Sequence, residues 1–151
     1  YVPYNGFGMY DFKKGVNDVY KPDAVDPSAR RYELHRVYVL EATLKPNMRH
    51  ISQKKVLYLD EDTYLALAGE DYDAQGKLWK VKEGYPIPDW ELGGTCDVEP
   101  FAQYNLTSGR YVSDQSVIGA GADIHYFEQS NDPHFTSGFY SAENLRSISE
   151  R

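Results

Sequence analysis

The sequence predicts a mainly β protein, built on a curved antiparallel sheet with long loops and a short C-terminal helix. Its aromatic content is the first observation: 14 Tyr, 6 Phe and 2 Trp occur among 151 residues. These residue types favour the half-buried surface of a sheet over a helix. The second is a series of runs that alternate between apolar and polar residues, the period of a strand. A chain of 151 residues is long enough to form one domain with its own core, so we expect a single domain, residues 1–151.

Residues 1–30 predict an extended N-terminal arm. They are rich in Tyr, Pro, Gly and Asp, and the two prolines of "KPDAVDP" exclude a regular helix or a central strand there. The chain opens "YVPYNGFGMYDFKKG", without an initiator Met. We therefore expect a fragment of a longer protein, with part of the core and of any pocket outside it.

Four alternating runs follow, and short polar links between them favour antiparallel neighbours. The runs are residues 31–45, 52–60, 63–74 and 77–84. The segment Asp73–Lys77 predicts a tight hairpin because Gly76 can adopt a positive φ. A meander of neighbouring strands is the expected arrangement.

The second half is less regular. The stretch "GYPIPDWELGGTCDVEP" holds three prolines and three glycines and predicts a crossing loop. The pattern predicts a second hairpin from residues 101–106 and 110–113, followed by a mixture of strand and loop over residues 115–128. A helix is predicted after Ser141, its N-cap, with Glu143 in the first turn.

Composition excludes several functions. Sixteen basic against 23 acidic residues give a net charge of −7, and no basic run stands out, so nucleic acid is not an expected partner. The single cysteine, Cys96, cannot form an internal disulfide. Neither the four histidines nor the acidic run "LDEDT" has metal-ligand spacing. No metal and no cofactor are predicted.

The predicted strand "RRYELHRVYVLEATLK" contains two candidate site residues, His35 and Arg36. Arg36 lies in the row that is otherwise apolar, and an unpaired charge there would cost several kcal/mol. We expect a structural ion pair with Glu70 or Asp71 across the sheet; contact with an anionic ligand is the alternative. His35 shares its row with acidic residues, so a hydrolase that uses His35 and a carboxylate is a further hypothesis. However, no nucleophile signature such as G-x-S-x-G accompanies it.

Aromatic residues recur on several of the predicted strands. Structural packing is the default interpretation, and the competing one is a concave surface that binds an apolar molecule. The residues of this candidate ligand site are Tyr38, Tyr58, Tyr64, Tyr72, Trp79 and Tyr104.

Three blocks resemble a bacterial domain-of-unknown-function family, number thirteen twenty-nine: "RYELHRVYVLEATLKP", "RHISQKKVLYLDEDTY" and "DYDAQGKLWKV". The opening "YVPYN" fits the family as well, and "HFTSGFYSAENLR" fits its C-terminal end more loosely. Members of the family are longer, exported proteins similar in fold to the lipoprotein carriers LolA and LolB. The resemblance implies the C-terminal part of a periplasmic protein and an incomplete half-barrel. It supplies no catalytic residues.

The leading hypothesis is a non-enzymatic periplasmic carrier for a hydrophobic, lipid-like ligand such as an acyl chain, in outer-membrane lipoprotein or lipid sorting. A membrane transporter or an outer-membrane protein is the partner expected for such a carrier. The alternative is an envelope module that pairs with other proteins, or with a second copy as a homodimer, through sheet edges. The hydrolase is the third hypothesis.

Overall fold

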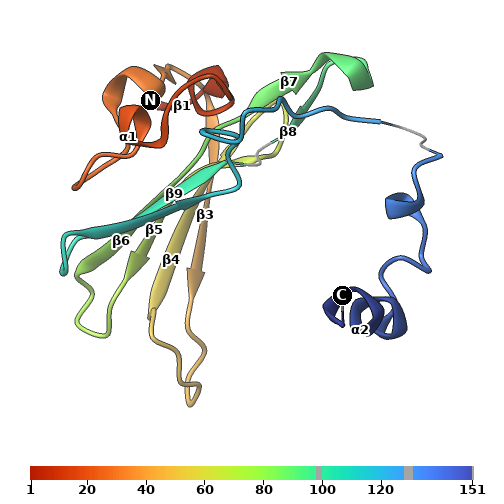
Figure 1. The fold of residues 1–151 in the computed structure, drawn as a ribbon. Helices are drawn as coiled ribbons and strands as arrows, with labels where there is room; N and C mark the ends of the chain where they lie inside the picture. Colours follow the sequence, from red (N-terminus) through yellow and green to blue (C-terminus); the bar gives the residue numbers. More distant parts are fainter. Residues whose placement is uncertain (98–99, 128–130, 151) are drawn as a thin grey trace.

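A six-stranded antiparallel sheet organises the protein (Figure 1). The computed structural model describes residues 1–97, 100–127 and 131–150. The strands follow the order β10-β9-β6-β5-β4-β3. Strands that follow one another in the sequence are therefore adjacent in the sheet, and β9 pairs with β6 across the segment that connects them. Their bounds are β3 (Val37–Thr43), β4 (Lys54–Asp60), β5 (Ala66–Tyr72), β6 (Leu78–Gly84), β9 (Phe101–Asn105) and β10 (Arg110–Asp114). Within the described residues the sheet stays open, with β3 and β10 as its edges. The prediction of a mainly β chain with an antiparallel meander is confirmed.

The strand register defines two faces of this sheet, because residues directly opposite one another point to the same side. One face, here called the arm face, carries Tyr58, Glu70, Glu83, Tyr104 and Tyr111. The opposite face, here called the open face, carries Tyr38, Leu40, Leu57, Gly69 and Lys82.

The N-terminal arm is folded, so the prediction of an extended arm is wrong. It contains β1 (Val2–Pro3), η1 (Gly6–Met9), α1 (Val16–Val19), η2 (Pro27–Ala29) and β2 (Tyr32–Glu33). β1 pairs antiparallel with β2. Prolines exclude long elements but allow single turns: Pro27 begins η2, where Asp26 accepts a hydrogen bond from the Ser28 amide (2.8 Å).

The arm packs against the sheet and the segment after β6. Its buried side chains meet those of the sheet in one hydrophobic core of Met9, Tyr10, Val19, Val25, Ala29, Tyr85, Ile87, Ala102 and Ile118. Tyr85 is fully buried, and the Tyr10 hydroxyl donates to the Tyr85 carbonyl (3.2 Å). Gly8 permits the close approach within the arm, since a Cβ there would lie 2.5 Å from the Ala29 carbonyl oxygen. Polar contacts join the arm to Glu83, Tyr104 and Tyr111 of the sheet, so the arm lies on the arm face.

The predicted crossing loop after residue 84 instead forms a small hairpin, which corrects that expectation. β7 (Ile87–Asp89) pairs with β8 (Thr95–Asp97) around η3 (Trp90–Leu92). The reversal is possible because Gly93 and Gly94 both have positive φ, 75° and 88°. Cys96 lies in β8. In the predicted mixed segment 115–128, Glu128 lies outside the described residues, and residues 115–127 form no strand.

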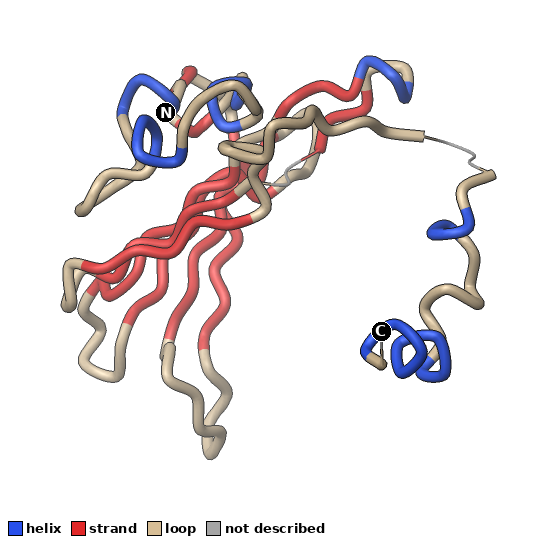
Figure 2. Tube along the Cα trace, in the orientation of Figure 1, coloured by secondary structure: helices blue, strands red, loops and turns tan. Residues whose placement is uncertain are grey.

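The C-terminal part lies apart from the sheet, on the side away from the arm (Figures 1 and 2). It holds η4 (Pro133–Phe135) and α2 (Ala142–Ser149). The Ser141 hydroxyl accepts a hydrogen bond from the Asn144 amide (3.1 Å), which confirms the predicted N-cap. Leu145 and Ile148 remain exposed on α2. Over the part of the chain that is described, no helix combines the length and apolar character needed to cross a membrane.

Candidate functional site

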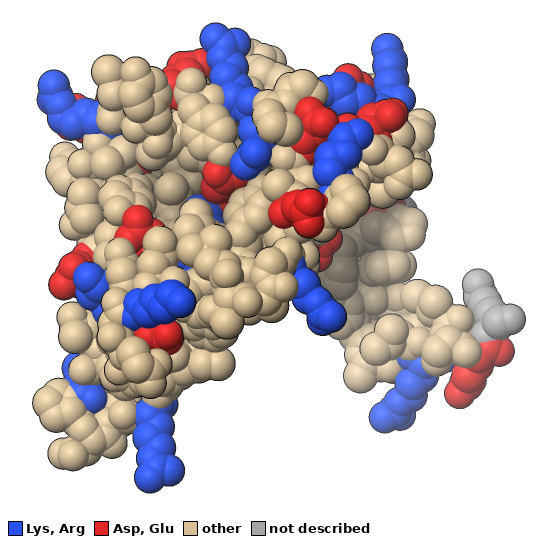
Figure 3. Space-filling model, turned by 90° about the vertical axis from the view of Figure 1, so that its left-hand side faces the viewer, with Lys and Arg blue, Asp and Glu red and all other residues tan. Residues whose placement is uncertain are grey.

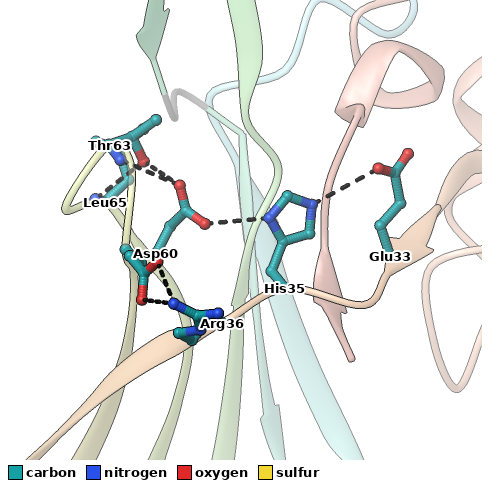
Figure 4. A network of polar contacts seen from close by, with 7 residues as sticks. Glu33, His35, Arg36, Asp60, Thr63 and Leu65 are labelled. Carbon is teal, nitrogen blue, oxygen red and sulfur yellow. Dashed lines mark hydrogen bonds and ion pairs between the residues drawn. The ribbon is translucent and has the colours of Figure 1, made fainter.

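His35 lies between two carboxylates (Figure 4). Its Nδ1 is 3.3 Å from Asp60 Oδ1, and its Nε2 is 3.6 Å from Glu33 Oε2. The Tyr4 ring stacks on the imidazole, with centroids 3.9 Å apart. Asn5 donates to Glu33 (2.7 Å), and this bond, with the charge of the neighbouring Arg31, holds the pKa of Glu33 below its usual value. Both ring nitrogens of His35 therefore face an acid.

Asp60 is the buried member of this network. Its Oδ2 accepts hydrogen bonds from the Thr63 amide (3.1 Å) and hydroxyl (2.9 Å), which shapes the turn between β4 and β5. Its Oδ1 has His35 Nδ1 at ion-pair distance, but outside hydrogen-bond geometry. The arrangement ties the segment before β3 to the turn after β4.

Arg36 pairs with Glu61, so the predicted pairing with Glu70 or Asp71 is wrong. Arg36 Nη1 lies 3.0 Å from Glu61 Oε1, and 82% of the arginine side chain is exposed. β3 begins only at Val37. Arg36 therefore precedes the strand, and its carbonyl accepts from the Glu61 amide (3.2 Å).

The two acids proposed for Arg36 have other partners. Asp71 is buried and bonds to Lys82 (2.8 Å). Glu70 accepts hydrogen bonds from the hydroxyls of Tyr58 (3.0 Å) and Tyr72 (2.5 Å). The bond to Glu70 raises the pKa of Tyr72 to about 12.

A second acid on the arm face, Glu83, is contacted by polar side chains that include two from the arm. It accepts hydrogen bonds from Tyr32 and Tyr85, the latter at 2.7 Å, and Arg30 Nη1 lies 3.4 Å away. Burial and the Glu83 charge raise the pKa of Tyr85. Sequence reasoning missed this cluster because Arg30 and Glu83 are 53 residues apart and carry no local signal.

A cavity of about 440 Å³ separates the arm from the sheet. β1 and β2 form one wall, and the arm face forms the other, with Val37, Tyr58, Glu70 and Val81 among the lining residues. The cavity therefore joins apolar walls to acidic groups.

A smaller hollow of about 250 Å³ lies on the open face. Its lining is largely apolar and includes Leu57, Ala66, Gly69 and Phe101. Gly69 leaves room for it, since a Cβ at this position would lie 3.1 Å from Leu57 Cδ2. A glycine inside a predicted strand was the available sequence signal.

The six aromatic residues of the predicted ligand site do not line one surface, which corrects that expectation. Tyr38 is on the open face, where its ring stacks with that of Tyr64 (5.8 Å), but Tyr58 is on the arm face. Tyr72 and Tyr104 also belong to the arm face. Trp79 lies at an irregularity of β6, with the Lys80 ammonium 4.2 Å from its ring centre. A one-residue offset between strands is enough to change the face.

Charges of both signs are scattered over the face seen in Figure 3, and no basic patch stands out there. Among the described residues, no group of three or more His, Cys, Asp or Glu side chains is placed to hold a metal ion.

Proteins similar to this chain include ones from three bacteria. The chain is 38% identical over 120 residues to an uncharacterized protein of Pseudomonas aeruginosa, a match that covers 75% of this chain and 25% of that protein. This chain thus spans about a quarter of the length of that relative. Two solved structures are similar. The first is a putative outer membrane lipoprotein-sorting protein domain from Vibrio parahaemolyticus, with 24% identity, a TM-score of 0.43 and coverage of 52% of this chain and 32% of that chain.

The second is a DUF1329 family protein from Desulfovibrio piger, with 19% identity and a TM-score of 0.47 over 70% of this chain and 41% of that one. The family model described as "Protein of unknown function (DUF1329)" matches residues 1–146. The chain belongs to this family.

Proposed function

We propose that this chain is part of a non-enzymatic periplasmic carrier that holds a hydrophobic, lipid-like ligand against the open face of the sheet. The observation that carries the proposal is the apolar hollow around Gly69. Leu40 and Tyr38 extend the apolar surface toward β3 and are each about half exposed, at 51% and 50%. This exposed apolar surface supports the proposal, because contiguous apolar patches are where soluble proteins bind other molecules.

The size of the hollow suits part of an acyl chain. Each methylene group removed from water contributes about 0.8 kcal/mol. About six methylenes in the hollow would therefore contribute about 5 kcal/mol before the costs of association. The remaining chain would lie along the neighbouring leucines of β3 and β4. In this proposal a membrane transporter or an outer-membrane protein delivers or receives the ligand.

A catalytic role for His35 has less support. Both of its ring nitrogens face carboxylates, at 3.3 and 3.6 Å, so neither is directed at a free substrate position. The contacts of His35 described above include no Ser or Cys nucleophile. His35 serves in our proposal to join the arm to the sheet.

The binding test is a titration with dodecanoate followed by methyl NMR of Leu57 and ring signals of Phe101. We expect saturable shifts at these two residues and none at Tyr104, which lies on the arm face. Mass spectrometry of lipids extracted from the full-length protein would identify the natural ligand. Absence of saturable shifts together with absence of any copurified lipid would overturn the proposal.

The edge strand β3 favours a second candidate, an envelope module that pairs through sheet edges. The backbone amide of Leu44 and the carbonyl of Arg36 form hydrogen bonds with the chain of β4 and its ends. In an antiparallel pair, hydrogen bonding alternates from residue to residue, so the backbone groups of Val39 and Glu41 point outward from the sheet edge. Val39 is 62% exposed, and such an apolar edge readily accepts another strand. Pairing with a second copy would make the mass in light scattering rise with concentration; a constant monomer mass would count against a homodimer.

A further inference from the structure

The cavity on the arm face has features that the carrier proposal does not use. It lies on the side of the sheet opposite the apolar hollow. Aromatic side chains from two elements, Tyr32 of β2 and Tyr58 of β4, take part in its lining. Val37, Ala68 and Val81 supply apolar surface, and Glu70 supplies a carboxylate. A ligand that fits here must combine an apolar body with a positive charge.

The cations around the cavity are paired with acids other than Glu70. Arg30 faces Glu83 at 3.4 Å, and His35 faces Glu33 and Asp60. Lys82 also lines the cavity, but its ammonium lies 2.8 Å from Asp71 on the open face. Lys54, the cation on the neighbouring strand, lies 3.5 Å from Glu41 and 4.3 Å from the ring centre of Tyr72.

Over the described part of the chain, no Lys, Arg or His nitrogen comes within 4.0 Å of the Glu70 carboxylate. Its two tyrosine hydrogen bonds hold the carboxylate in place but do not neutralise it. A half-buried carboxylate without a counter-ion is electrostatically unfavourable, and a bound cation would relieve this.

We propose that this cavity binds a small organic ammonium ion, with Glu70 as its counter-ion and the Tyr32 and Tyr58 rings as its walls. A quaternary or protonated amine is attracted both to a carboxylate and to the faces of aromatic rings. The apolar walls match the alkyl substituents of such an ion and offer little to a hydrated metal ion. Glu83, the diagonal neighbour of Glu70 on the adjacent strand, already has Arg30 as its counter-ion, so Glu70 is the acid left for the ligand.

The test is an NMR titration of the 151-residue chain with choline chloride. We expect saturable shifts of the backbone amides of Val37 and Glu70, which line this cavity and not the hollow on the open face, with a dissociation constant on the order of 1 mM. The neutral isostere 3,3-dimethyl-1-butanol, which replaces the ammonium nitrogen by carbon, should bind about tenfold more weakly.

Variants separate the role of Glu70 from a general effect of charge. Glu70→Gln, which keeps the shape of the side chain, should weaken choline binding about tenfold, and Tyr58→Leu should weaken it by removing a wall. Glu61→Gln is the matched control, because it removes the same charge outside the cavity and should leave binding unchanged. An undisturbed spectrum of each free variant confirms that it is folded.

A comparison of choline with phosphocholine identifies the source of the ammonium group. Stronger binding of choline indicates a free amine, because the phosphate would meet Glu70 and Glu83; binding of phosphocholine at least as strong indicates a lipid headgroup. Both outcomes support an ammonium site. The proposal is overturned if choline gives no saturable shifts, if the neutral isostere binds equally well, or if Glu70→Gln and Glu61→Gln behave alike. Since these signals arise on the arm face, failure here is distinguishable from failure of the carrier proposal.

Discussion

Replacing Asp60 by Ala should strongly destabilise the protein. Asp60 is fully buried and accepts two hydrogen bonds from Thr63, at 3.1 and 2.9 Å. Hydrogen bonds to a charged acceptor contribute about 1.5 kcal/mol each, so their loss costs about 3 kcal/mol. The ion-pair contact with His35 is lost as well, and with it the link from the segment before β3 to the turn after β4.

Urea unfolding followed by tryptophan fluorescence measures this cost. With a slope of about 2 kcal/mol per molar urea, the midpoint should fall by about 1.5 M. Glu61→Gln is the control at the next position. Its partner Arg36 is 82% exposed, so the midpoint of this variant should change by less than about 0.3 M. The reasoning is refuted if Asp60→Ala and Glu61→Gln unfold at the same urea concentration.

Three other predictions concern the tyrosine pair, the arm and the helix. Because Glu70 raises the pKa of folded Tyr72 to about 12, the stabilisation it supplies should be complete below pH 10 and disappear as the pH rises toward 12. Glu70→Gln should lower this pKa toward 10 in tyrosine ring NMR; an unchanged titration would contradict it. Gly8→Ala should lower the melting temperature by several degrees, because its Cβ would lie 2.5 Å from the Ala29 carbonyl oxygen. Gly138→Ala is the control and should leave the melting temperature unchanged, because no atom lies within 4 Å of the added Cβ. Ser141→Ala should weaken α2 by about 1 kcal/mol, seen as loss of helical Cα shifts in residues 142–149, while the urea midpoint of the sheet stays the same.

Local patterns were enough to predict the sheet. The alternation of apolar and polar residues located β3 to β6, and Gly76 located the β5–β6 turn, where its φ is 75°. Ser141 located the start of α2. Each of these signals depends on residues that are neighbours in sequence, so a single sequence contains it.

Contacts between distant residues could not be predicted in the same way. The pairing of Arg36 depended on where β3 begins. The predicted strand covered residues 31–45, whereas β3 begins at Val37, so Arg36 precedes the strand and meets Glu61 in the turn after β4 instead of an acid on β5. The split of Tyr38 and Tyr58 between two faces depended on the register of β3 and β4. Both follow from tertiary packing, which the alternation alone does not determine.

The packing of the arm could not be predicted from local patterns either. Its prolines excluded long elements, but nothing local indicated that Met9 and Val25 would pack against Tyr85. The hollow around Gly69 was missed because the space next to a glycine is defined by its neighbours on other strands.

The most direct test of the carrier proposal is to fill the hollow on the open face. Gly69→Val adds a side chain next to Leu57, whereas Ala42→Val also enlarges a side chain on the open face, but on the edge strand, outside the hollow. Dodecanoate binding to both variants and to the unmodified protein should be compared by isothermal titration calorimetry. The carrier proposal predicts that Gly69→Val binds at least about tenfold more weakly, while Ala42→Val binds as the unmodified protein does. Equal affinity of all three proteins would contradict it.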